Sequence, residues 1–120
     1  MVTGRVVRQG DIDLELAAGG YLRRPDGQIR QIPGLDRIAQ ATVAESIRVR
    51  WGTPRGGMPG CTYLWRREIV LALWLFDQPG EDVRDVWLHE LGHCLVGRGC
   101  ERAREWQRAW VAEQHAELYK

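Results

Sequence analysis

The sequence predicts an α+β fold that has a small mixed sheet, a helix before it and two helices after it. Three observations lead to this prediction. Apolar residues recur at helical spacing over 34–44, alternate with arginines over 47–51, and form an almost unbroken apolar run over 69–75. With 120 residues, of which 44% are hydrophobic, the chain is long enough to bury one core.

The first 33 residues carry the weakest pattern of the chain. We expect residues 1–33 to form an N-terminal arm, with short strands at 5–7 and 14–16 and a turn at Pro25-Asp26-Gly27. The main domain is expected over 34–120 and begins with the helix and the strand named above. The alternation in that strand is typical of a strand with one buried face.

Residues 52–60 are rich in glycine and proline, which cannot continue a regular element, so we expect a mobile loop there. Two strands are predicted after the loop, at 61–66 and 69–75, with a break at 67–68. Because the break between them is short, the two strands can pair as a hairpin.

Two helices complete the predicted fold. Pro79 and Gly80 end the apolar strand, and the acidic Glu81 and Asp82 favour the start of a helix that extends to about Val96. The last helix is expected over 101–118, and the short connection folds the two helices back on each other. The predicted core includes Trp65, Trp74 and Trp87, and the predicted inner face of the last helix carries Ala103, Trp106 and Trp110.

Composition and charge restrict the location and the partners. Seventeen basic and sixteen acidic residues leave a net charge of +1, so we expect neither a nucleic-acid partner nor an anionic membrane surface. The longest apolar run is too short to span a bilayer, and the first ten residues contain no secretory signal. Three cysteines match no disulfide framework, which favours a reducing compartment; we expect the cytoplasm.

The first of the two last helices carries His89-Glu90-Leu91-Gly92-His93. The spacing of four residues places both imidazoles on one helix face, where each can offer a nitrogen to one Zn²⁺. Glu90 lies about 100° round the helix from His89, beside the metal, where it can take a proton from a zinc-bound water. Two histidines and one further ligand would leave a coordination position for that water.

This stretch resembles the HExxH motif of the zincin metallopeptidases. The likeness is close over 87–95 and looser over 34–118. It implies that His89 and His93 bind zinc, that Glu90 is the general base, and that the protein is a zinc-dependent endopeptidase. It also implies that residues 61–66 form an edge strand that holds an extended peptide or protein substrate, which agrees with the free hydrogen-bonding groups of an exposed edge.

The motif alone does not identify the third ligand. Metzincins continue as HExxHxxGxxH, but Val96 and Gly99 stand at the last two of these positions. If the chain has one inserted residue, Cys100 falls at the third-ligand place, and a thiolate can bind zinc, although it reduces the Lewis acidity of the ion. SprT-like metalloproteases carry histidine and glycine where Arg102 and Ala103 stand, so the small glutamate-type zincins, including those of phages and mobile elements, are the closer likeness.

Gluzincins take the third ligand from a glutamate on a following helix. In an antiparallel helical hairpin, the residue level with His93 is close to position 105, which favours Glu105. Glu101 and Glu113 remain as alternatives. Glu105 shares a helix face with small residues that would allow a close approach, namely Ala109, Ala112 and Ala116.

A second function stays open at this point: a catalytically inactive zincin-fold binding or regulatory module with a structural zinc. An open fourth coordination position would favour the enzyme, and a closed site would favour the module. His115, the remaining histidine, is expected to be exposed. Five arginines near the expected cleft would favour acidic substrates or nucleic acid, although a solvated face is the commoner explanation: Arg48, Arg50, Arg55, Arg66 and Arg67.

Overall fold

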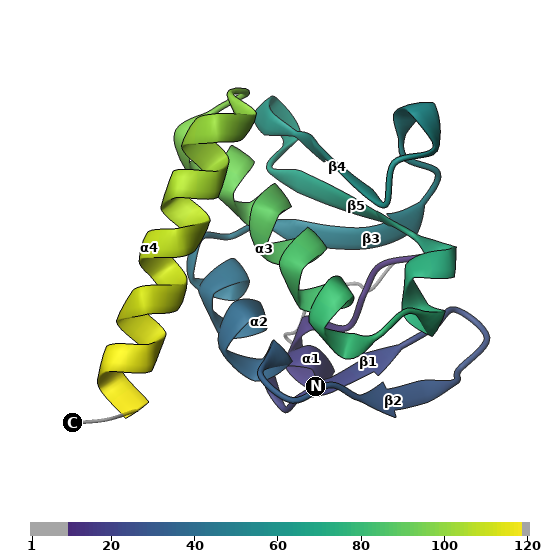
Figure 1. Ribbon diagram of the computed structural model, residues 1–120. Coiled ribbons are helices and arrows are strands. Elements are labelled where there is room, and N and C mark those ends of the chain that lie inside the picture. Colours follow the sequence, from purple (N-terminus) through teal and green to yellow (C-terminus); the bar gives the residue numbers. More distant parts are fainter. Residues whose placement is uncertain (1–9, 119–120) are drawn as a thin grey trace, which may run out of the picture.

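The protein contains a three-stranded mixed sheet that packs against helix α3 (Gly80–Val96) (Figure 1). Strand β3 (Arg48–Gly52) runs parallel to β5 (Glu68–Ala72), and β4 (Gly60–Tyr63) pairs antiparallel with β5 at the edge of the sheet. The computed structural model describes residues 10–118. The α+β class, the mixed sheet and the predicted pairing of the two later strands are confirmed.

The protein has three long helices, α2 (Leu35–Ala44), α3 (Gly80–Val96) and α4 (Cys100–Leu118), and α4 packs against α3. Each helix begins within one residue of its predicted first residue. The core forms where α2 and α3 meet the sheet, and Trp87 is fully buried there. Its indole N–H donates to the buried Thr42 hydroxyl at 3.0 Å. No helix within 10–118 is both long and apolar enough to cross a membrane.

Both later strands are shorter than predicted. After Tyr63 the chain forms a 3-10 turn, η2 (Leu64–Arg66), and after Ala72 it forms another, η3 (Leu73–Asp77). The pairing of β5 with β3 ends at Gly52, so residues beyond Ala72 have no strand partner on that side. The expectation that Trp65 and Trp74 lie in the core is therefore wrong, because these turns leave the two side chains 87% and 49% exposed.

The described residues of the N-terminal segment form a helix and a small hairpin. Helix α1 (Leu14–Ala18) replaces the predicted strand at 14–16, because the Asp13 side chain caps it by accepting from the Leu16 N–H. The predicted strand at 5–7 lies outside the described residues. Apolar residues of this segment belong to the core cluster, among them Ile12, Leu14, Ala17, Leu22 and Ile32.

Strands β1 (Tyr21–Arg23) and β2 (Ile29–Gln31) pair antiparallel around the predicted turn. The Arg24 guanidinium donates to Asp26 at 2.6 Å and, together with the Gln28 N–H, holds the pKa of this exposed carboxyl at about 2. The turn at 25–27 is thus confirmed, and a local ion pair supports it.

Helices α3 and α4 form the predicted antiparallel hairpin. Gly97, with φ of 98°, ends α3, and α4 begins three residues later. The helices approach most closely at Gly92, where an added Cβ would lie 3.1 Å from both the Ala103 carbonyl oxygen and the Trp106 ring. The predicted inner face is confirmed, since Ala103 is fully buried and Trp106 packs against the core.

Candidate metal centre

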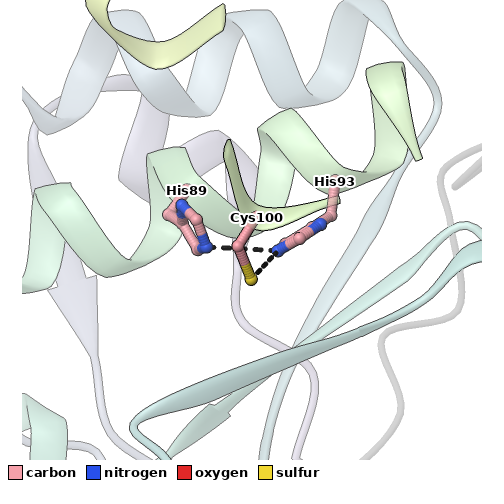
Figure 2. A group of neighbouring side chains, drawn as sticks. All are labelled: His89, His93 and Cys100. Atoms are coloured by element: carbon pink, nitrogen blue, oxygen red, sulfur yellow. Dashed lines mark hydrogen bonds between the residues drawn. The ribbon is translucent and has the colours of Figure 1, made fainter. Parts of the chain in front are cut away.

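His89 and His93 lie one turn apart on α3 and their rings converge (Figure 2). Their Nε2 atoms are 3.1 Å apart, and the rings are nearly perpendicular, at 84°. Both side chains are half-buried. The spacing of the two histidines thus produces the juxtaposition expected from it: two ring nitrogens aimed at one point.

Cys100, the first residue of α4, brings a third donor atom to the same point. Its Sγ lies 3.7 Å from His93 Nε2, and the donor atoms of Cys100, His89 and His93 all lie within 4.8 Å of one another. The tight turn at Gly97 returns the chain over His93 and positions the cysteine. Within residues 10–118, this is the group of histidine, cysteine and acidic side chains that could hold a metal ion.

Neighbouring groups act on each of the two histidine rings. His93 Nδ1 lies 2.8 Å from the Gly97 carbonyl oxygen, and because a carbonyl only accepts, Nδ1 carries the proton and Nε2 has a free lone pair. The Gln107 side chain of α4 acts on the His89 ring, where it raises the pKa of the imidazole. Such contacts fix the orientation of metal-binding imidazoles.

The surroundings of His89 favour its neutral form. Burial lowers its pKa below the ordinary value of 6.5, and the neighbouring His93 and Arg104 act in the same direction. Glu90 and the Gln107 side chain oppose this effect. A lowered pKa leaves the imidazole unprotonated at neutral pH, which is the form that binds metal ions.

Glu90 lies beside the group but faces the sheet instead of joining it. Its side chain is buried, at 8% exposure, and the Thr62 hydroxyl of β4 lies 2.8 Å from its Oε1. Gly60, also on β4, leaves no room for a side chain, since a Cβ there would lie 3.2 Å from Glu90 Cγ and 2.9 Å from Val86. Strand β4 therefore rests directly on the Glu90 side of α3.

Glu105 is exposed and is not a member of the group. Ala103 faces α3, and Glu105 lies about 200° round the helix from it, on the opposite side of α4. Glu101 and Glu113 are also exposed and outside the group. The prediction that the alanine face of α4 approaches α3 is also wrong. Its three members, Ala109, Ala112 and Ala116, are exposed.

A signal for Cys100 was present in the sequence. Its position lies on the same face of α4 as Ala103, Gln107 and Trp110, at spacings of three, four and three residues. Trp110 predicts that this face of α4 is turned inward. Cys100 and Gln107, which lie on the same face, are then expected to point toward α3.

The other candidate residues stand apart from the group. His115 is exposed, as expected. Cys61 and Cys94 are free and half-buried, and burial raises the pKa of the Cys94 thiol to about 11.

No family model, curated protein or solved structure matches this chain.

Proposed function

We propose that the protein is a zinc-dependent metallopeptidase in which His89, His93 and Cys100 hold the ion and Glu90 is the general base. The convergence of the three donor atoms carries this proposal. Around a tetrahedral zinc ion, two histidine nitrogens lie about 3.3 Å apart, and a nitrogen and a thiolate sulfur about 3.6 Å apart. The separations of 3.1 Å between the Nε2 atoms and 3.7 Å between Cys100 Sγ and His93 Nε2 are close to these values.

The ligand set leaves room for catalysis. Three protein ligands are typical of catalytic zinc sites, in which the fourth position is open, whereas structural sites have four. When bound, zinc would act as a Lewis acid toward the scissile carbonyl and would lower the pKa of a coordinated water. Cysteine is an established ligand at catalytic zinc as well as at structural zinc.

Glu90 has the surroundings that a general base needs. Its carboxylate is shielded from bulk water, and the Thr62 hydroxyl, which lies 2.8 Å from Glu90 Oε1 and 3.0 Å from the Glu90 carbonyl oxygen, can orient it. In this role Glu90 accepts a proton from the attacking water and later donates it to the leaving amine. The Thr62 contact also ties the base to β4, so the base and the substrate strand would be positioned together.

The unpaired edge of β4 supports a peptide as the substrate. Strand β4 pairs only with β5 in the described sheet, so its other edge offers free N–H and C=O groups to an extended chain. We place the protein in the cytoplasm, because the ligand Cys100 is exposed and a reducing compartment keeps such a thiol free.

Cleavage of a mixed peptide pool by the zinc-loaded protein, followed by mass spectrometry, tests this function. We expect Glu90→Gln to retain stoichiometric zinc and to lose cleavage by at least about 100-fold. Glu105→Gln is the matched control and should retain both. If Glu90→Gln cleaves as fast as the wild type, Glu90 is not the base.

A binding or regulatory module with a structural zinc is the second candidate. The thiolate ligand favours it, because cysteine is the commonest ligand of structural zinc. It predicts a zinc-loaded protein that leaves every peptide of the pool intact. A fourth protein ligand at the ion would establish this candidate in place of the enzyme.

A further inference from the structure

Two arginines and two aromatic rings form an exposed cluster at the end of β4. The cluster consists of Arg55, Tyr63, Trp65 and Arg66, and we call it the arginine–aromatic patch. The Arg66 guanidinium carbon lies 5.5 Å from the Tyr63 ring centre and 5.9 Å from the Trp65 ring centre, and that of Arg55 lies 5.7 Å from Tyr63. Trp65 is the most exposed large apolar side chain of the described residues, at 87%.

The patch contains the unpaired members of the arginine set near the expected cleft. Arg48 and Arg50 form ion pairs with Glu68, and Arg67 forms one with Glu45. Arg55 and Arg66 have no acidic partner within residues 10–118. Their two positive charges are therefore available to a ligand.

The patch and the candidate metal centre lie on opposite faces of the same strand, because the Thr62 side chain contacts Glu90 of α3 and the next side chain along β4, that of Tyr63, points to the other face of the sheet. Tyr63, Trp65 and Arg66 follow directly after Thr62, whose hydroxyl lies 2.8 Å from Glu90 Oε1.

We infer that the arginine–aromatic patch is a subsite for acidic side chains of a peptide bound along β4. A guanidinium stacked on a ring keeps its N–H groups free in its own plane, where they match the two oxygens of a carboxylate. Trp65 adds apolar area beside these charges for the stem of the acidic side chain or for a neighbouring residue. The substrate class is thus acidic peptides; only the link to cleavage rests on the proposed function.

Binding can be measured without cleavage, in zinc-loaded Glu90→Gln protein. The probes are a fluorescently labelled Glu-rich peptide and the same peptide with Gln in place of Glu, followed by fluorescence anisotropy. We expect the Glu-rich peptide to bind more tightly, and Arg55→Gln and Arg66→Gln each to weaken its binding by up to about fivefold. Arg23→Gln, which makes the same charge change on the exposed surface of β1, should have no effect.

Equal binding of the two peptides, or equal effects of Arg23→Gln and Arg66→Gln, would overturn the inference. Direct binding of a fluorescently labelled thymidine oligonucleotide that depends on Arg55 and Arg66, together with no binding of the Glu-rich peptide, would also overturn it in favour of a single-stranded nucleic acid. If the wild type cleaves the peptide pool without preference for acidic sequences, the peptidase function is supported and the acidic subsite is rejected. Patch-dependent binding without any cleavage by the wild type supports the subsite and rejects the peptidase.

Discussion

The identity of the third ligand depends on a single turn between two helices. Gly97 ends α3 one turn after His93, and Cys100 becomes the first residue of α4, with its Sγ 3.7 Å from His93 Nε2. A longer connection would have moved the start of α4 away from the histidines. The same geometry turns Glu105 to the far side of α4, where it is exposed.

Replacing Cys100 should therefore weaken metal binding. We expect Cys100→Ala to lower zinc affinity by at least about 100-fold, because a thiolate ligand is lost. The exposed position of Cys100 means that the fold should survive the change. Competition with a chromophoric chelator measures the affinity.

Glu105→Gln is the control for this prediction, because it removes a carboxylate from the same helix without touching the group. It should bind zinc like the wild type. The reverse pattern, in which Glu105→Gln loses zinc and Cys100→Ala retains it, would return the third-ligand role to the glutamate.

Thr62 is a positioning residue for Glu90. Thr62→Val keeps the shape of the side chain but removes the hydroxyl that lies 2.8 Å from the carboxylate. We expect kcat for peptide cleavage to fall about tenfold, with zinc content unchanged, since a general base that is less well oriented is less efficient. Thr62→Ser should restore the hydrogen bond and most of the activity. A Thr62→Val enzyme with normal kcat would show that the hydroxyl does not position the base.

At the scale of elements, the contact between α3 and α4 holds the ligands in place. Gly92 sits where the two helices are closest, so a methyl group there would press on the Ala103 backbone and the Trp106 ring. In an exposed helix interior, the change from glycine to alanine would stabilise the helix by about 1 kcal/mol. Here we expect Gly92→Ala to destabilise the protein by about 1–3 kcal/mol, because the helices must separate.

Urea unfolding of the zinc-free protein measures this effect. Gly99→Ala is the matched control, since a Cβ at Gly99 meets only the flexible Arg102 side chain, at 3.7 Å. If Gly92→Ala is as stable as Gly99→Ala, the close packing at this point does not limit the approach of the helices.

Periodicity was sufficient to predict α2, β3, α3 and α4, because each has a regular apolar face. The chain beyond Ala72 was predicted as strand from its apolar composition, but a strand also needs a partner, and β3 ends at Gly52. Helix α1 was missed although Asp13 is a typical N-cap, because the segment is too short for a periodic signal.

The histidine pair was predictable because its ligands lie on one helix and depend only on local spacing. Cys100, Thr62 and Gln107 reach the site from other elements. Their positions depend on which face of α4 packs against α3 and on the register of β4 against Glu90, and neither is fixed by local pattern.

At the scale of the whole molecule, a metal ion would join two elements that otherwise meet through side-chain packing. The ligands come from the last turns of α3 and the first residue of α4. An ion that binds the folded state stabilises it, by about 2.7 kcal/mol when its free concentration is 100 times the Kd.

Thermal unfolding should therefore respond to metal. We expect zinc to raise Tm and a chelator to lower it. His89→Ala should abolish both responses, whereas His115→Ala, which changes an exposed histidine outside the group, should keep them. A Tm that is the same with zinc and with chelator would reject a metal-stabilised fold.

X-ray absorption spectroscopy of the stoichiometric zinc complex tests the central claim most directly, because it identifies the atoms bound to the ion. The ligand group of His89, His93 and Cys100 predicts two imidazole nitrogens at about 2.0–2.1 Å, one sulfur at about 2.3 Å and one further light atom from water. Zinc bound only by nitrogen and oxygen, with no sulfur at that distance, would contradict the account.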